Sequence, residues 1–271
     1  MIFLYKNGYF DLDKKTYVVG ILNLTPDSFS DGGKYKTIDD VLFAVQKMQQ
    51  DGVDLIDVGG ESTRPGFSPV SVDEELCRVI PVIKKIHERF SIPISIDTTK
   101  SAVAKEAIGS GVSIINDIWG CVKDPKMLNV IKDSGVGVII GHNRNSANIS
   151  KNIFLELEEF FEKIINKAQE MKIPKEYLCI DPNIGFAKTY EENIEIIKNL
   201  SYFLKFKLPI LIGVSRKSVI GQTLGLPVDQ RLEGSLALAV ICALGGANFV
   251  RVHDVKETVR ALKMADKIFR N

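Results

Sequence analysis

Polar side chains follow short apolar runs at many points along the 271-residue sequence. In DVGGESTRPG, residues 57–66, an apolar run ends in two glycines, and a carboxylate, two hydroxyls, a guanidinium and a proline come next. Similar run ends carry Asn23, Asp97, Asn116 and Asp117, His142 and Asn143, Asp181 and Asn183, Ser215 to Ser218, and Arg251 with His253. This repetition indicates that the run ends meet at one site that needs several kinds of polar group.

Some of these polar residues stand where burial is expected. Asp97, Asn116, Asp181 and Arg251 lie within an apolar run or directly at its end. An unpartnered charge or amide in such a place costs several kcal/mol. Each should therefore contact a ligand or pair with another buried group inside the fold, and both alternatives stay open. Thr37 and Asp254, by contrast, stand where helix N-caps are expected and need no other role.

The polar residues divide into two chemical groups. Asp97, Asn116 and Asp181 offer mainly carboxylate and amide acceptors, which suit a flat heterocycle with several N–H donors, such as a 2-amino-4-oxopyrimidine edge. The cationic group contains Arg64, Arg216, Lys217, Arg251 and His253. Because VSRKS leads into a predicted helix start, this group suits a phosphate or carboxylate. One side of the expected pocket reads a ring and the other holds an anion.

Zinc chemistry is not favoured by the sequence. The three histidines, His87, His142 and His253, have unrelated spacings, and His87 lies on a charged helix where we expect it to be solvated. A hard cation held mainly by substrate phosphates fits better, with Asn23 as the strand-end amide that assists it. The glycines of SDGGKY, residues 30–35, predict a mobile lid, and Phe29 beside them could cover a bound ring.

The elements that position these residues are predicted by periodicity. Eight apolar runs are VVGILNL (18–24), DLIDVG (54–59), IPISID (92–97), SIINDI (113–118), VGVIIGH (136–142), YLCID (177–181), PILIGVS (209–215) and NFVRVH (248–253). Amphipathic helical patterns lie between them, the clearest at 150–172 and at 255–270, where Val259, Leu262, Ala265 and Phe269 form one stripe. Continuous apolar strands predict a parallel sheet covered on both faces.

Eight strand–helix repeats in this length favour a closed (β/α)₈ TIM barrel over an open doubly wound sheet. The Asn7–Gly8 pair between alternating apolar residues predicts a two-residue hairpin turn, which we expect to close the bottom of the barrel. No linker-like segment divides the chain, so we expect a single domain over 1–271, with the hairpin at 1–17 and the barrel at 18–271.

Composition limits the class of partner. A net charge of +1 gives no basic field for a nucleic acid, so the expected partners are small molecules. No window approaches the ~20 apolar residues of a membrane span, and no signal peptide is recognised. The four cysteines have no framework spacing and are interpreted as buried thiols in a reducing compartment. These features predict a cytoplasmic protein.

The motifs together resemble a known family. GILNLTPDSFSDGG, DLIDVGGESTRPG, ISIDTTK, IINDI, IDPNIGFAK, IGVSRKS and FVRVHDV follow one another between residues 18 and 255, and they look like the strand-end motifs of dihydropteroate synthases at every strand except the fifth. The resemblance implies a TIM barrel, usually a homodimer, that condenses dihydropterin pyrophosphate with p-aminobenzoate, uses Mg²⁺ and is a target of sulfonamides.

The resemblance also implies roles for individual residues. Asp97, Asn116, Asp181 and Lys217 would hold the pterin, and Asn23 would coordinate Mg²⁺. Arg251, His253 and Thr63 would bind the pyrophosphate, and Asn23, Lys217, Arg251 and His253 would form the catalytic set. Phe29, Thr63, Pro65, Phe186, Lys217 and Ser218 would border the p-aminobenzoate. Asp57 and Glu61 are left between structural hydrogen bonding and chemistry, and Arg64 between an anion contact and a contact between loops.

Two positions depart from the family pattern. Gly141 stands where the family usually has a methionine that would pack on the pterin face, and Asn183 stands where it usually has glycine. The wall of the pocket would then be looser, or another side chain would fill it. Two other functions compete: a pterin-binding methyltransferase, which has no need of ESTRPG, SRKS or a pyrophosphate clamp, and a catalytically idle pterin-binding homologue.

Overall fold

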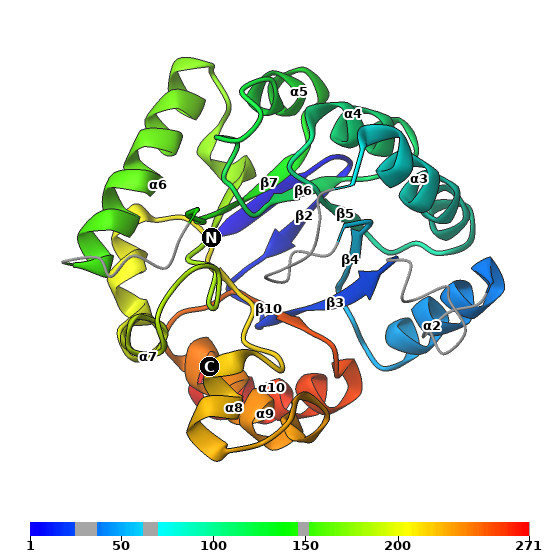
Figure 1. Cartoon of the computed structure of the whole chain (residues 1–271). Helices are drawn as coiled ribbons and strands as arrows, with labels where there is room; N and C mark the ends of the chain where they lie inside the picture. Colours follow the sequence, from blue (N-terminus) through cyan, green and yellow to red (C-terminus); the bar gives the residue numbers. More distant parts are fainter. Residues whose placement is uncertain (25–36, 62–69, 146–151, 271) are drawn as a thin grey trace.

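The computed structural model describes residues 1–24, 37–61, 70–145 and 152–270. Its larger sheet contains β3 (Tyr17–Asn23), β4 (Leu55–Gly59), β5 (Ile94–Asp97), β6 (Ile114–Asp117), β7 (Gly137–Gly141), β8 (Leu178–Asp181), β9 (Leu211–Ile212) and β10 (Phe249–Val252). All pair in parallel, in the order β8-β7-β6-β5-β4-β3-β10-β9. A parallel bridge between Ile180 and Ile210 joins the two ends, so the sheet curves into the predicted barrel (Figure 1).

Helices follow every strand of this larger sheet and cover its outside (Figure 1). They are α2 (Ile38–Gln50), α3 (Val72–Arg89), α4 (Ser101–Gly109), α5 (Met127–Ser134), α6 (Ile153–Glu170), α7 (Tyr190–Lys198), α8 (Ser218–Leu224), α9 (Leu232–Leu244) and α10 (Val255–Phe269), with 3-10 turns η1 (Lys175–Tyr177), η2 (Leu200–Phe206) and η3 (Val228–Gln230). Both α8 and α9 follow β9. The strand–helix alternation confirms the (β/α)₈ prediction.

Alternation along each strand separates two environments. On β4, Ile56 and Val58 belong to the large core shared with the helices, whereas Leu55 belongs to a second cluster inside the barrel. Side chains two residues apart point to the same face of a strand, so Leu55, Asp57 and Gly59 all face inward. The interior is therefore apolar at its amino end and becomes polar toward the carboxyl ends of the strands, where TIM barrels carry their sites.

The amino-terminal hairpin closes the apolar end. β1 (Ile2–Tyr5) pairs antiparallel with β2 (Gly8–Asp11), and its Phe3 and Phe10 are buried in the inner cluster, both edge-on to Phe249. This confirms the predicted plug. The turn itself was predicted one residue too late: Lys6 and Asn7 form it, with Asn7 at a φ of 70°, and Gly8 already belongs to β2.

Other local expectations were also wrong. Phe269 is 64% exposed at the end of α10, whereas Val259, Leu262 and Ala265 of the predicted stripe are buried. Cys77 is exposed on α3, whereas the other three cysteines are buried; all four are free thiols. His87 is exposed, as expected. No helix of the described ranges is long and apolar enough to cross a membrane.

Candidate active site

The predicted site residues gather at the carboxyl ends of the strands wherever the structure describes them. Asn23, Asp97 and Asp181 are the last residues of β3, β5 and β8, Asn116 and Arg251 are the third residues of β6 and β10, and His253 follows β10. Lys217 caps the start of α8, Ser218 is its first residue, and Phe186 lies between β8 and α7. Phe29, Thr63, Arg64, Pro65 and the predicted lid at 30–35 lie outside the described residues.

One buried cluster, here called the Asp57 cluster, contains Asp57, Ser95, Asp97, Asn116 and Arg251. The fully buried Asp57 carboxylate accepts three hydrogen bonds, from Ser95 Oγ at 2.6 Å, Asn116 Nδ2 at 3.1 Å and Arg251 Nε at 2.6 Å. Arg251 Nη2 also donates to Asp97 Oδ2 at 2.9 Å. Inward alternation points these side chains into the barrel, where Asp57 is level with Ser95 and Asp97, two residues further along β5, is level with Asn116.

Asp97, Asn116 and Arg251 therefore pair with other buried groups inside the fold, which is one of the two alternatives that the sequence left open for them. Arg251 is shared by two carboxylates, so the ionised cluster carries one excess negative charge. Burial raises the pKa of Asp97 to about 7; the Arg251 guanidinium opposes this rise and the Asp57 carboxylate adds to it. Pairing does not exclude ligand binding, because the excess charge favours a ligand edge that brings N–H donors.

Asp181 lies outside these hydrogen bonds but within reach of the same charges. Its Oδ1 accepts the backbone N–H of Asn183 at 2.7 Å. Burial raises the pKa of Asp181 to about 6, and that hydrogen bond, Lys217, Lys188 and Arg251 all act in the opposite direction. The structure thus places Asp181 beside the cations that the sequence assigned to the other side of the pocket.

The two departures from the family pattern lie side by side. A Cβ on Gly141 would come within 2.4 Å of Asn183 Nδ2 and 2.8 Å of Ile118 Cα. The Asn183 amide lies in that space and donates to the Ile118 carbonyl at 3.1 Å. Its φ of 55° lies in the left-handed region that Asn tolerates. The wall is therefore filled by another side chain, as one of the two sequence interpretations required.

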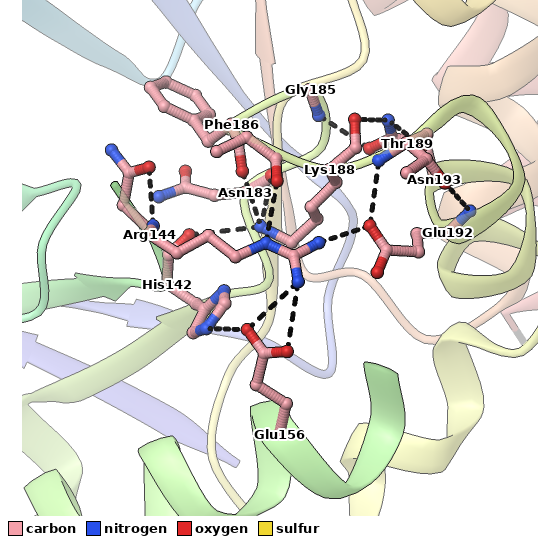
Figure 2. A network of polar contacts seen from close by, with 12 residues as sticks. His142, Arg144, Glu156, Asn183, Gly185, Phe186, Lys188, Thr189, Glu192 and Asn193 are labelled. Atoms are coloured by element: carbon pink, nitrogen blue, oxygen red, sulfur yellow. Dashed lines mark hydrogen bonds and ion pairs between the residues drawn. The ribbon is translucent and has the colours of Figure 1, made fainter. Parts of the chain in front are cut away.

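A second cluster, here called the Lys188 cluster, joins the loop after β8 to the end of β7 (Figure 2). The buried Lys188 ammonium donates to the carbonyl oxygens of His142 at 3.2 Å, Asn183 at 3.0 Å and Phe186 at 3.3 Å. Burial lowers the pKa of Lys188 to about 7, although Asp181 favours its charged form. Neutral carbonyl dipoles thus hold this cation and define the path of the loop.

His142 and Arg144 support the Lys188 cluster from the outside. Figure 2 shows Arg144 between Glu156 of α6 and Glu192 of α7, and it also donates to the Ala187 carbonyl at 2.7 Å. His142 Nε2 lies 3.3 Å from Glu156 Oε1, and burial lowers the pKa of His142 to about 3. His142 is therefore an uncharged part of the loop support, although its strand-end position had suggested a place in the site.

Lys217 lies against the loop that the Lys188 cluster holds. Its Nζ is 4.3 Å from the centroid of the Phe186 ring, which is cation–π distance. Ser218 begins α8 directly after it. Lys217 and Phe186 could therefore contact an aromatic ligand together, and the charge of Lys217 also lowers the pKa of Asp181.

The β9 and β10 ends are also joined. Ser215 Oγ lies 3.0 Å from His253 Nδ1 and accepts the His253 backbone N–H at 3.2 Å, which fixes the imidazole. Arg216 does not extend the cationic group, because its Nε and Nη2 bind Asp254 at 3.0 and 2.5 Å. Asp254 is the N-cap residue of α10, as expected, but it has another role: its side chain makes no capping hydrogen bond and its carboxylate binds Arg216 instead. Thr37 does cap α2.

Several functional candidates were missed or left open by sequence reasoning. Ser95 alternates with Asp97 on β5, a signal that the pattern of inward positions could have revealed. Lys188 carried no such signal, because its burial depends on the fold of its loop. Glu61 now has a structural role, since it forms an ion pair with Lys100, which also binds Glu75. No group of three histidine, cysteine or acidic side chains within the described ranges could hold a metal ion.

Comparison with known proteins decides the family. Residues 19–253 match the model of the pterin binding enzyme family. The chain belongs to the pterin-binding enzyme family. The family member from Clostridium beijerinckii, a dihydropteroate synthase, is 48% identical over 96% of this chain and 97% of its own length.

Solved members of the pterin-binding enzyme family have the same fold. The dihydropteroate synthase of Clostridium difficile, solved in the presence of pteroic acid, is 47% identical, with a TM-score of 0.93 over 97% of this chain and all of that one. The Yersinia pestis enzyme in a sulfonamide drug complex is 40% identical, with a TM-score of 0.92 over 99% and 98% of the two chains. The function of this chain is that of these transferases.

Proposed function

We propose that the chain joins a 6-hydroxymethyl-7,8-dihydropterin, activated as its pyrophosphate, to p-aminobenzoate, and releases 7,8-dihydropteroate and pyrophosphate. The observation that carries this proposal is the meeting of buried carboxylate and amide groups with Arg251, Lys217 and His253 at one end of the barrel. The reaction needs both: acceptors for the N–H donors of a pterin ring, and cations for a departing anion.

The ring half of the proposal uses Asp97, Asn116, Asp181 and Lys217. The excess negative charge of the Asp57 cluster and the raised pKa of Asp181 support it, because ring N–H donors would relieve both. A pterin ring supplies several donors on one edge, and buried carboxylates without enough cations need such partners.

The anion half uses Arg251 and His253, with Thr63 from the stretch outside the described residues. Ser215 holds the His253 ring, and two carboxylates hold the Arg251 guanidinium, so both donor groups are oriented before substrate arrives. Preorganised donors of this kind stabilise developing negative charge without reorganising during the reaction.

Mg²⁺ fits the residues near Asn23. Gly59 has no side chain, and the point where a Cβ would stand lies 3.5 Å from Asn23 Oδ1 and 3.9 Å from Asp97 Oδ2. Two oxygen atoms therefore flank the same small space. Oxygen donors without a protein cage of several carboxylates suit an ion held mainly by phosphate oxygens. We assign Asn23 as its protein ligand, and the ion when bound would offset negative charge on the pyrophosphate.

The chemical step needs charge stabilisation more than a base. The bond from the pterin methylene carbon to the pyrophosphate oxygen breaks, and its electron pair leaves with pyrophosphate, beside Arg251 and His253. The p-aminobenzoate nitrogen then donates its lone pair to the methylene carbon and loses a proton to water or to pyrophosphate. Phe186, Lys217 and Ser218, with Phe29, Thr63 and Pro65, border the arylamine and restrict its approach.

We also propose a homodimer, sensitivity to sulfonamides and a single-domain chain. The exposed apolar face of α9 and α10, with Ile241, Leu244, Met264, Ile268 and Phe269, supports association with a second copy. Sedimentation equilibrium tests the homodimer, since a monomer at all concentrations would contradict it.

The complex of the Yersinia pestis relative supports sulfonamide binding. Cytoplasmic location stays a prediction.

One assay tests the function. Purified protein is mixed with dihydropterin pyrophosphate, p-aminobenzoate and Mg²⁺, and dihydropteroate and released pyrophosphate are measured. We expect equal amounts of both products. Pterin binding without either product would favour an idle pterin-binding homologue, and methyl transfer from a methylated folate would favour the methyltransferase, so each alternative has its own outcome.

A further inference from the structure

Asp57 accepts hydrogen bonds from two residues that have different roles in the proposed function, Asn116 and Arg251. It is the middle residue of β4, faces the barrel interior and is fully buried. Its Oδ1 is held by Ser95, and its Oδ2 is shared by the Asn116 amide and the Arg251 guanidinium. Asn116 belongs to the ring half of the site and Arg251 to the anion half. A single carboxylate oxygen therefore joins the two halves.

The Asn116 amide is oriented by this contact. A carboxylate accepts hydrogen bonds and repels carbonyl oxygens, so it selects the orientation in which Nδ2 points toward Asp57. The Asn116 Oδ1 atom is then directed away from Asp57 and serves as the acceptor for a ring N–H. Without Asp57 the amide has no reason to keep this orientation, and the reversed amide would present donors to a donor-rich ring.

The Arg251 guanidinium is oriented in the same way. Nε binds Asp57 and Nη2 binds Asp97, so two carboxylates define the plane of the group. The Nη1 end is the part that these two carboxylates do not hold. Loss of Asp57 would leave one contact, about which the guanidinium can rotate away from the anion.

We propose that Asp57 is a positioning residue that couples the two halves of the site, because it aims the Asn116 amide at the ring and the Arg251 guanidinium at the pyrophosphate. This inference rests on the proposed function. It assigns Asp57 no contact with either substrate. Asp57 acts only through its two neighbours, and this distinguishes it from Asp97 and Asp181.

Double-mutant cycles test the coupling. Asp57→Ala is made alone, with Asn116→Ala and with Arg251→Ala, and calorimetry measures the affinities for 6-hydroxymethylpterin and for inorganic pyrophosphate. Alone, it should weaken each at least tenfold. In the Asn116→Ala protein, Asp57→Ala should lower the pterin affinity less than threefold, and in the Arg251→Ala protein it should lower the pyrophosphate affinity less than threefold. In each case the side chain that Asp57 positions is already absent.

A conservative variant and a control sharpen the test. Asp57→Asn should return the pterin affinity to within threefold of wild type, since one amide oxygen can accept from both neighbours while its NH₂ faces Ser95. Ser134→Ala, on α5, removes a hydroxyl that donates only to carbonyls of its own helix, so both affinities should change less than threefold. If Asp57→Ala does not fold in a thermal melt, Asp57→Leu takes its place, because leucine fills the volume without accepting.

The outcomes separate the inference from the function. Equal losses in all three backgrounds, or an Asp57→Asn protein as weak as Asp57→Ala, would overturn the role of Asp57 while wild-type turnover of both substrates leaves the function standing. Absence of wild-type dihydropteroate formation would remove the function and this inference with it.

Discussion

The Asp57 cluster and the Lys188 cluster solve the problem of buried charge in different ways. In the first, the Arg251 guanidinium lies between two carboxylates on neighbouring strands, so ionised groups pair with one another. In the second, an ammonium lies among three neutral carbonyls of loop and strand-end residues. The barrel strands fix the positions in the first cluster, whereas in the second the lysine itself holds the loop in place.

This difference separates two uses of polarity in one site. The Asp57 cluster has more negative charge than it can balance, so it is suited to recruit donors from a ligand. The Lys188 cluster is complete within the protein, so it is suited to hold Phe186 and Asn183 in position. Variants of the first should affect chemistry and binding most, and variants of the second should affect loop geometry.

The largest effect is expected for Arg251→Ala. It leaves Asp57 and Asp97 without their shared cation, which should cost about 3–5 kcal/mol of unfolding free energy. Turnover and pyrophosphate affinity should fall together, measured by steady-state kinetics and pyrophosphate product inhibition.

Arg270→Ala is the matched control for Arg251→Ala. Arg270 pairs with Asp266 on α10 and donates to the Leu12 carbonyl, next to the hairpin that closes the opposite end of the barrel, so its loss should leave turnover unchanged. Normal pyrophosphate product inhibition in the Arg251→Ala protein would count against the anion assignment.

Asp181→Asn should weaken pterin binding about 100-fold, or ~2.7 kcal/mol, without unfolding the protein. The amide oxygen of the introduced asparagine can still accept the Asn183 N–H, but its amide NH₂ group is a donor and cannot accept from the N–H donors of the ring. In the wild type, a carboxyl with a pKa of about 6 is protonated below that pH, so pterin affinity should fall as the pH decreases through 6. Calorimetric titrations from pH 5 to 8 measure both effects.

Asp117→Asn provides the control for this pH dependence. Burial also raises the pKa of Asp117 to about 6, but its carboxylate accepts the backbone N–H groups of Trp119 and Cys121. The variant should keep the wild-type pterin pH profile. An Asp181→Asn protein with unchanged pterin affinity would show that the ring is read elsewhere.

Lys188→Met should destabilise the protein by about 2 kcal/mol, because three buried carbonyls lose their donor. The KM for p-aminobenzoate should rise more than kcat falls, since Phe186 loses its support. A lysine whose folded pKa is near 7 binds fewer protons than the unfolded chain up to about pH 10. Its contribution to stability therefore increases as the pH rises above 7.

Denaturant unfolding at pH 7 and pH 9 tests whether the contribution of Lys188 to stability increases with pH. The stability gap between wild type and Lys188→Met should be wider at pH 9. Lys205→Met replaces a more exposed lysine paired with Glu158 and should change stability by less than ~1 kcal/mol. A gap that narrows with pH would exclude a neutral Lys188 in the folded protein.

The fold and much of the site could be predicted because they follow local patterns. Seven of the eight strands lie within about two residues of their apolar runs, and the eighth, β9, keeps only Leu211 and Ile212 in the ladder. Strand-end positions located Asp97, Asn116, Asp181 and Arg251 correctly. Their partners could not be predicted, since the contact of Arg251 with Asp57 joins residues 194 positions apart and depends on how the barrel closes.

The smallest effect is expected for Asn183→Gly, in the Lys188 cluster beside Asp181. Glycine adopts the left-handed φ of 55° easily, so the backbone bond to Asp181 should persist and stability should change by about 1 kcal/mol or less. The amide beside Gly141 and its bond to Ile118 are lost, which opens the pocket wall. Pterin affinity should therefore fall only severalfold, while the pH dependence set by Asp181 stays the same. A shifted pH profile would instead mean that the Asn183 side chain, and not only its backbone, controls the ionisation of Asp181.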